Sequence, residues 1–306
     1  MITDRSQRWR DRRSRFVTDD TVIDPRRYAV DVVAHDTARA FVADHHYLSR
    51  YPAAQLAVGL FGPGRGGISS LDGIIVFGVP ASGAVITRHT GYDDPTRGCV
   101  LQRLLCLPSV AANGESYFAA RAFRLLRQAK PVIQSVVSFS DPQFGHCGCV
   151  YASLSGAYRG PTRPRTVLRI AGETISDRTL SKIRNLETGH GGAVDQLVRL
   201  GAPRPRTEEH LRAWLERCRR ERILVPARQA SLFTYCFELT RSARHTGRTL
   251  PRLAYPIRSD VLREQLGAEP VVPTRREGGG GIVSTRGDEP CASNGRSRSP
   301  RQTRTA

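Results

Sequence analysis

Short apolar runs separated by polar turns dominate residues 28–170 and predict strands that alternate with a few helices. Runs rich in β-branched and aliphatic residues predict strands over 28–33, 55–61, 73–79, 99–107, 132–139 and 165–170. Helical spacing predicts helices over 36–43 and 117–129, the second with one apolar face formed by Phe118, Ala122, Leu125, Leu126 and Ala129. The pattern therefore predicts an α+β domain built on a mixed sheet.

The stretch 132–158 carries the densest pattern, a buried strand followed by polar residues and then a helix. The strand should end at Asp141, because Pro142 cannot extend a ladder of hydrogen bonds. A helix is predicted from Gly148 to Tyr158, with Tyr151 and Tyr158 on one face. Polar groups at the carboxyl end of a buried strand often bind ligands in α/β sheets. Asp141 is also a common turn or cap residue, so both interpretations stay open.

Two other segments place polar residues where chemistry is plausible. Arg103 stands in an apolar strand, where a charge must be paired or must bind an anion. The first helix ends at His45, His46 and Tyr47, and only one of two adjacent histidines can face a given cleft. These residues are candidates for a site, with a helix-capping role as the alternative.

The segment 113–116 (Asn, Gly, Glu, Ser) opens the helix predicted over 117–129, with Asn113 as its N-cap. Amides of a first helical turn after a strand form an anion site that suits the pyrophosphate of a nucleotide-like cofactor. This signal is unspecific, since every strand-to-helix connection has such a terminus.

The carboxyl-terminal third has a different pattern. Helices are predicted over about 176–186, 192–200 and 207–222, and short strands over 231–239 and 252–257. Arg178, Lys182 and Arg184 share the polar face of the first helix, which fits either phosphate contact or plain solvation. The predicted organisation is a basic flexible arm (1–27), a catalytic domain (28–170), a basic helical accessory region (171–260) and a disordered tail (261–306).

The charge balance narrows the class of partner. Among 306 residues, 47 Lys and Arg against 28 Asp and Glu give a net charge of +19, which indicates a polyanion and most simply nucleic acid. Seven unevenly spaced cysteines and the lack of a long apolar run predict a reducing cytoplasm, with no disulfide framework and no membrane span. Cys147 and Cys149 are interpreted as a buried pair of small residues rather than as zinc ligands.

The predicted element order of strand, helix, three strands, helix, strand and helix resembles the GNAT, or N-acetyltransferase-like, fold. This resemblance implies an acyl-CoA cofactor, acetyl-CoA or a relative, whose pyrophosphate would lie at Asn113, Gly114, Glu115 and Ser116. It also implies that Tyr151 lies near the thiol, where a phenol can protonate a departing thiolate.

A closer resemblance is carried by HHYLS (45–49), FGVPAS (77–82), LQRLLC (101–106), NGES (113–116) and SFSDPQFGHCGCVYASLSGAY (138–158). Over about 28–170 the chain resembles the Mom family of phage and prophage DNA-modification proteins. The resemblance implies conversion of the adenine N6 amine in double-stranded DNA to a carbamoylmethyl derivative, inside a bacterial host, as protection against restriction. It places functional roles on His46, Tyr47, Arg103, Ser116, Asp141 and Tyr151, with Ser109 and Ser138 as competing serines. It also implies a bound iron, for which His46, Tyr47, Asp141 and Tyr151 offer oxygen and nitrogen ligands of suitable hardness, although the spacing alone does not place a metal.

The chemistry of adenine limits the acyl-transfer analogy. Its N6 amine is conjugated with the ring and needs a base, for which Tyr47 and Asp141 are candidates, and Arg103 could stabilise negative charge. The base would have to leave the duplex, and Tyr92, Phe144 or Tyr158 could stack on it. Two alternatives remain, a small-molecule N-acyltransferase and a non-catalytic DNA-binding protein on the same fold.

Overall fold

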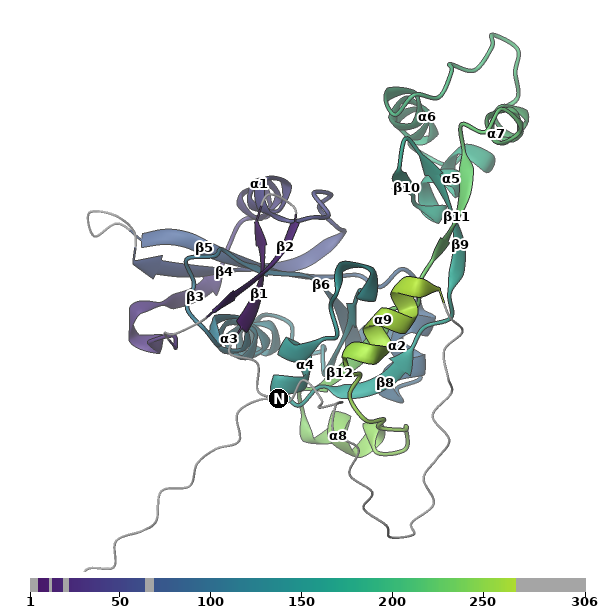
Figure 1. Cartoon of the computed structure of the whole chain (residues 1–306). Helices are drawn as coiled ribbons and strands as arrows, with labels where there is room; N and C mark the ends of the chain where they lie inside the picture. Colours follow the sequence, from purple (N-terminus) through teal and green to yellow (C-terminus); the bar gives the residue numbers. More distant parts are fainter. Residues whose placement is uncertain (1–4, 11–12, 19–21, 64–68, 268–306) are drawn as a thin grey trace, which may run out of the picture. The chain divides into compact units, whose positions relative to one another are not determined.

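The structure, a computed structural model, describes residues 5–10, 13–18, 22–63 and 69–267, and the chain forms two compact units (Figure 1). The larger unit comprises residues 1–162 and 232–306, and the smaller unit is an insertion of residues 163–231. The Thr162 amide donates to the Leu232 carbonyl at 2.8 Å, and the Leu232 amide donates to Thr162 Oγ1 at 2.9 Å. The chain therefore leaves the larger unit and returns to it at neighbouring points.

A seven-stranded sheet forms the centre of the larger unit, in the order β3-β4-β5-β6-β7-β12-β8. Its strands are β3 (Ala29–Val32), β4 (Ala54–Pro63), β5 (Ser69–Gly78), β6 (Gly98–Cys106), β7 (Ser135–Ser140), β12 (Phe233–Glu238) and β8 (Ala157–Pro161). All neighbours pair antiparallel except β6 and β7, which run parallel. The predicted mixed sheet of an α+β fold is thus confirmed.

Helices cover both faces of this sheet. Successive β5 residues point to opposite sides, so this strand contributes side chains to the core on each face. Ile75 and Phe77 belong to the core beneath α3 (Gly114–Ala129), whose Phe118, Ala122 and Leu126 are buried as predicted. Ile74 and Val76 pack on the other face against α1 (His35–His45). On that same side α2 (Gly83–Thr90) buries Ile86 against the β6 and β7 residues Val100 and Val137.

The parallel pairing of β6 and β7 is short. It joins Gly98 through Leu101 to Ser135 through Ser138, whereas β6 continues to Cys106 along β5. Parallel strands need a long crossover, and α3 supplies it. Beyond Leu101 the two strands have no mutual pairing among the described residues, so their carboxyl ends are separated.

Several boundaries differ from the prediction, chiefly because β12 joins the main sheet. Residues 171–260 do not form one accessory region, since 232 onward belongs to the larger unit. The segment predicted as a last strand over 252–257 is irregular, and α9 (Arg258–Leu266) occupies the start of the predicted disordered tail. The rest of that tail, 268–306, lies outside the described residues.

Smaller corrections concern the ends of elements. The helix predicted to reach Tyr158 is the short α4 (Cys149–Ser153), and Tyr158 lies in β8, so the two tyrosines do not share a helical face. The helix α2 lies between β5 and β6, where no helix was predicted. The described part of the predicted flexible arm contains the hairpin of β1 (Arg5–Arg10) and β2 (Arg13–Thr18) and the turn η1 (Pro25–Arg27).

The smaller unit has a core of its own. Its three-stranded sheet is ordered β10-β9-β11, with β9 (Arg165–Ile170), β10 (Glu173–Ile175) and β11 (Val225–Gln229). The predicted helices are present as α5 (Asp177–Arg184), α6 (His190–Arg199) and α7 (Leu211–Arg220). Trp214 is fully buried at the centre, and its indole N–H donates to the Pro203 carbonyl at 2.8 Å.

A buried ion pair ties the β8 and β12 edge of the main sheet to α8 (Arg241–Gly247). Arg159 Nη2 lies 2.9 Å from Glu238 Oε1, and both side chains are about 4% exposed or less. The guanidinium also donates to the carbonyls of His89, Gly247, Leu250 and Pro251. A buried charge that keeps this many partners is compensated, whereas its loss leaves the other charge isolated.

We expect Arg159→Met to lower the free energy of unfolding by roughly 3 kcal/mol, because Glu238 and four carbonyls lose a buried partner. The matched control is Arg252→Met, which removes the second guanidinium on Glu238. That side chain is 57% exposed, so the loss should stay below roughly 1 kcal/mol. Chemical denaturation of both variants measures this, and equal losses would contradict the assignment of the stabilising partner to Arg159.

Candidate functional site

A β-bulge in β6 sets the direction of Arg103. The register with β5 shifts so that Leu101 pairs with Phe77 and Arg103 with Val76, which leaves Gln102 as the extra residue. Gln102 Nε2 donates to the Val79 carbonyl at 2.8 Å. A Cβ on Gly78 would lie 2.6 Å from Gln102 Nε2 and 2.6 Å from the Ala53 carbonyl oxygen. The bulge therefore needs glycine at position 78.

Arg103 connects this bulge to the loop after α1. Its Nη1 donates to the Gln102 carbonyl and its Nη2 to the Arg50 carbonyl, each at 2.7 Å. Burial lowers the pKa of the guanidinium, and Nε is buried without a hydrogen-bond partner among the described residues. Arg103 thus holds the 46–50 loop with one hydrogen bond and its own strand with another, and it keeps one buried donor for a further group.

His46 and Tyr47 lie at the start of that loop, directly after α1. His46 is 6% exposed, and its Nδ1 accepts a hydrogen bond from the Leu48 amide at 2.9 Å. Burial, and after it the positive charges of Arg103 and His146, lower the pKa of His46 to about 3. The imidazole is therefore neutral at physiological pH, and because Nδ1 accepts, the ring proton is on Nε2. His45, by contrast, is exposed, so His46 is the histidine that faces inward.

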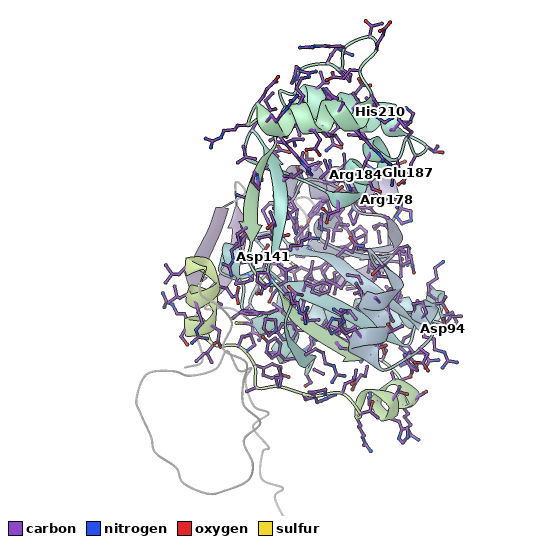
Figure 2. All side chains as sticks on the ribbon, turned by 90° about the vertical axis from the view of Figure 1, so that its right-hand side faces the viewer. Asp94, Asp141, Arg178, Arg184, Glu187 and His210 are labelled. Atoms are coloured by element: carbon purple, nitrogen blue, oxygen red, sulfur yellow. The ribbon has the colours of Figure 1, made fainter. Side chains whose placement is uncertain are left out.

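Asp141 caps the turn η4 (Pro142–Phe144), and its Oδ1 accepts from the Gln143 amide at 3.0 Å. Asp94 caps the turn η3 (Pro95–Arg97) in the same way but is exposed (Figure 2). Burial raises the pKa of Asp141, whereas hydrogen bonds to Thr96 lower that of Asp94. The cap explains why aspartate precedes proline at both positions, and burial is what distinguishes Asp141.

Elements near the end of the chain support the Asp141 turn. The α9 side chain of Gln265 donates from Nε2 to the Pro142 carbonyl at 2.9 Å. Pro142 itself is buried. The sequence interpretation missed this support, because the low apolar periodicity of α9 gave no strong helix signal.

Tyr151 on α4 packs its ring against two β12 aromatics, 5.2 Å from the Tyr235 ring and 5.8 Å from the Phe237 ring between centroids. Burial raises the pKa of Tyr151, and a hydrogen bond with Ser138 works in the opposite direction. Ser138 is the last β7 residue paired with β6 and is fully buried. It is therefore Ser138, one of the two competing serines, that contacts the predicted tyrosine.

Tyr47 joins these parts into one site. Its ring stacks on His46 at 4.3 Å and lies 4.4 Å from the Phe144 ring between centroids. Burial raises the pKa of Tyr47, Asp141 and then Tyr151 raise it further, and Arg103 lowers it. The electrostatic effects of all three show that they lie near the Tyr47 phenol. The structure therefore brings together five of the six predicted functional residues, namely His46, Tyr47, Arg103, Asp141 and Tyr151.

Ser116 is the exception. Its hydroxyl donates to the Asn113 carbonyl at 3.0 Å within the first turn of α3, and no described contact joins it to the Tyr47 cluster. Asn113 adopts a left-handed backbone and occupies the predicted N-cap position, but its side chain does not cap the helix. The Gly114 amide donates to the Ala111 carbonyl, so it is not available to an anion as predicted.

A segment from the start of the chain lies along this helix terminus. Val22 forms a β-bridge with Ala112, and the Ile23 amide donates to the Ala112 carbonyl at 2.9 Å. The Tyr117 hydroxyl lies 3.3 Å from the Pro25 carbonyl oxygen and 3.4 Å from that of Tyr28. The first turn of α3 is therefore in contact with protein rather than fully open.

Of the three aromatic residues predicted to stack on a base, only Phe144 belongs to the cluster. Tyr158 is 6% exposed and packs against Phe233 in the core. Tyr92 is 7% exposed and donates to Gln134 Oε1 at 2.7 Å, next to the start of β7. The predictions for Tyr92 and Tyr158 were wrong because both side chains are core residues that the sequence pattern did not identify as such.

The cluster combines groups of defined protonation at neutral pH. The raised pKa values keep Tyr47 and Tyr151 protonated, so both phenols are hydrogen-bond donors, and His46 is a neutral donor. Asp141 is the carboxylate able to accept a proton. Such an arrangement can remove a proton from a bound group while donors stabilise the charge that develops.

Comparison with known proteins gives one family. The model of the Mom protein family matches residues 27–257, which includes both units of the structure. No curated protein matches the chain. Among the described residues, no helix has the length and apolar character needed to cross a membrane.

Protonation of His46 should make the fold sensitive to acid. The unfolded chain binds this proton near the ordinary pKa of 6.5, and the folded state only near 3, so the unfolded state holds more protons between these values. Stability therefore falls as the pH decreases through this window. Between about pH 7.5 and about pH 5, we expect the parent to lose roughly 2 kcal/mol more unfolding free energy than His46→Asn.

Urea denaturation at both pH values measures this difference. His45→Asn changes an exposed neighbour and is the matched control, which should follow the parent. An equal acid response in the His46 variant and the parent would show that the buried imidazole is not the group responsible.

Proposed function

Because the chain belongs to the Mom protein family, which points to phage DNA modification, we propose that it converts the adenine N6 amine in DNA to a carbamoylmethyl derivative. The observation that carries this proposal is the half-buried Tyr47, Asp141 and Arg103 cluster at the separated ends of β6 and β7. It supplies a base, a phenol donor and a cation around one position. Modified adenine would protect the DNA from restriction enzymes.

The protonation states assign the roles. Asp141 takes a proton from N6, and the nitrogen lone pair forms a bond to the methylene carbon of the donor. The bond between that carbon and the leaving group breaks with its electron pair, and Tyr151 returns a proton to the leaving group. Tyr47 is too strongly protonated to serve as the base, so it donates a hydrogen bond instead. Arg103 Nε, a buried donor with no hydrogen-bond partner among the described residues, would stabilise the negative charge that develops.

The fold supports a GNAT-like arrangement, since a crossover helix joins two parallel strands whose ends separate. Its cofactor is less well supported. The Gly114 amide is engaged, and residues 22–28 contact the first turn of α3, where the pyrophosphate of an acyl-CoA was expected. Among the described residues, no three His, Cys, Asp or Glu side chains gather as metal ligands, so an iron held here would need the phenol oxygen of Tyr47 or Tyr151 beside His46 and Asp141. No step of the mechanism passes through either group.

A base inside a duplex cannot reach a half-buried carboxylate, so the target adenine must leave the stack. Tyr47 and Phe144, with ring centroids 4.4 Å apart, form an aromatic wall beside Asp141. Stacking on such a wall compensates part of the cost of extruding the base. Phe144 is in the turn that Asp141 caps, which fixes both relative to each other.

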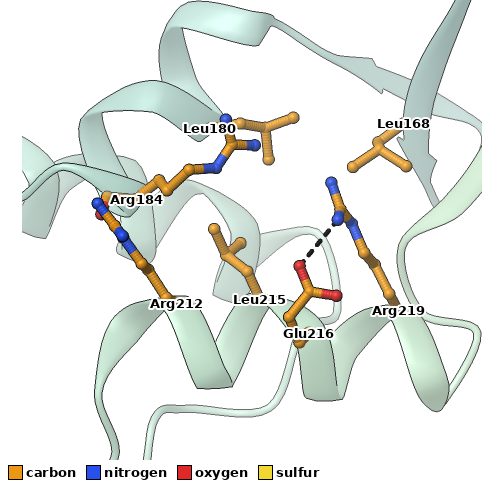
Figure 3. Close-up of a pocket in the computed structure, with 7 residues that line it drawn as sticks. All are labelled: Leu168, Leu180, Arg184, Arg212, Leu215, Glu216 and Arg219. Carbon is orange, nitrogen blue, oxygen red and sulfur yellow. Dashed lines mark hydrogen bonds and ion pairs between the residues drawn. The ribbon is translucent and has the colours of Figure 1, made fainter.

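The smaller unit offers a surface for the DNA backbone. It holds fifteen Lys and Arg against eight Asp and Glu. A pocket of about 210 Å³ is lined by Arg184, Arg212 and Arg219 over an apolar base of Leu168, Leu180 and Leu215 (Figure 3). Glu216 pairs with Arg219 at 2.8 Å, whereas Arg184 and Arg212 form no ion pair with a described carboxylate. Two uncompensated guanidiniums at one pocket suit phosphate oxygens.

This surface distinguishes the proposal from its rivals. A small-molecule N-acyltransferase has no use for a unit with such an excess of basic residues. A non-catalytic DNA-binding protein has no need of a half-buried carboxylate with a raised pKa beside two protonated phenols. Both features together favour an enzyme that acts on DNA.

Restriction of plasmid DNA tests the catalytic role of Asp141. Plasmid from bacteria that express the parent should resist enzymes whose recognition sequences contain adenine, and Asp141→Asn should restore cleavage, because an amide is no base. Asp94→Asn makes the same change in the equivalent turn cap at an exposed position and should leave the resistance intact. Full cleavage with the parent, or resistance with Asp141→Asn, would contradict the proposal.

Salt dependence of DNA binding tests the pocket. Changing both Arg184 and Arg212 to Gln should reduce the slope of log affinity against log salt by about 2, one for each lost phosphate contact. The matched control changes Arg165 and Arg204, which pair with Asp177 and Asp195 and do not line the pocket. Its slope should change much less. Equal slopes for the two double variants would show that the pocket is not part of the surface that binds DNA.

A further inference from the structure

Cys147 and Cys149 face each other across Gly148 in the turn before α4. Their sulfur atoms are 2.9 Å apart, closer than van der Waals contact and within reach of a disulfide after a small movement. Cys149 is exposed and Cys147 is half-buried, so the prediction of a buried pair was wrong. The reason is that Cys147 lies in the turn before α4 and Cys149 is the first residue of that helix, so the core encloses neither thiol.

The turn is built to bring the two thiols together. Gly148 has a left-handed backbone with φ of 82°, a conformation that favours glycine. A Cβ at this position would lie 2.5 Å from the Tyr235 ring. The Tyr235 hydroxyl in turn donates to the Cys147 carbonyl. Contacts on both sides of the backbone therefore hold Cys147 and Cys149 in this arrangement.

The other described cysteines have different surroundings. Cys99, Cys106, Cys218 and Cys236 are all buried. Burial raises the pKa of the Cys99 and Cys236 thiols to about 12. Thiols of this kind react slowly, because the thiolate is the reactive form. Among the described residues, Cys147 and Cys149 are thus the pair that solvent can reach.

We propose that Cys147 and Cys149 form a redox-active dithiol that closes reversibly to a disulfide with a small disulfide such as oxidised glutathione. The thiolate of Cys149 attacks one glutathione sulfur, forms a mixed disulfide and releases one glutathione thiol. The thiolate of Cys147 then attacks the Cys149 sulfur and releases the second. Two protein thiols are oxidised, one glutathione disulfide is reduced to two thiols, and the protein loses two hydrogen atoms.

The position of the pair links its redox state to the candidate site. His146 directly precedes Cys147, and Tyr151 follows Cys149 by two residues on α4. Closing the disulfide moves the backbone on both sides of Gly148, which is the N-cap of α4. A disulfide between residues this close in sequence and this exposed is also readily reduced, which suits a reversible modification.

Mass spectrometry of the full chain tests the proposal without reference to catalysis. After incubation with oxidised glutathione, the protein should lose two hydrogen atoms, and the change should map to one peptide that contains both cysteines. Dithiothreitol should reverse it. Phenylarsine oxide binds tightly when two neighbouring thiols both bond to its arsenic atom. It should therefore bind the reduced protein and not the oxidised one.

Matched variants separate this pair from other thiols. Cys147→Ser and Cys149→Ser should each abolish both the hydrogen loss and the arsenical binding, whereas Cys291→Ser removes a thiol outside the described residues and should change neither. The melting temperatures of the variants check that each is folded. Two thiols that stay open to alkylation, a stable mixed disulfide with glutathione, or hydrogen loss that persists in the single variants would each overturn the proposal.

Discussion

The pairing of β6 with β7, and its end at Leu101 and Ser138, is the constraint on which the candidate site depends. As long as the two strands are paired, their side chains contribute to the core. Where pairing stops, β6 continues along β5 and presents Arg103, while β7 ends in the turn that Asp141 caps. A parallel pair also requires α3 as its crossover, so the same constraint fixes the helix that covers one face of the sheet. The loop with His46 and Tyr47 is then held by the hydrogen bond from Arg103 to the Arg50 carbonyl.

Burial is the main cause of the pKa shifts in this site. It raises the pKa of Asp141, Tyr47 and Tyr151 and lowers that of His46, so the imidazole and both phenols are neutral at physiological pH and Asp141 is the one carboxylate of the four. A site of this kind attracts a neutral base more readily than a phosphate. The strong positive charge of the chain lies elsewhere, for example on the arginine pocket of the smaller unit. In the proposed function, the two tasks of holding a polyanion and reacting with a neutral amine thus fall to different residues.

The sequence was informative where one physical rule decided the outcome. Alternating apolar runs predicted the strands, helical spacing predicted α3, and Pro142 predicted the end of β7. The sequence did not predict the role of β12, because no local pattern shows that a strand at 233–238 enters the sheet between β7 and β8. Because β12 lies there, its Tyr235 ring packs against Tyr151. Gln265, later in the chain, donates a hydrogen bond to the Pro142 carbonyl. Ser116 was placed by its motif, yet its hydroxyl bonds within its own helical turn. The residue roles that were inferred from the family resemblance therefore depended on tertiary contacts, which the spacing of residues along the sequence does not reveal.

The most direct measurement is tandem mass spectrometry of nucleosides from plasmid DNA of bacteria that express the whole chain. The account predicts one new nucleoside derived from deoxyadenosine, with the added mass on the base and fragments that place it on the exocyclic nitrogen. DNA without any new nucleoside, although the expressed protein is folded, would contradict the account. A new nucleoside derived from deoxycytidine or deoxyguanosine would contradict it as well, because the site would then act on a different amine.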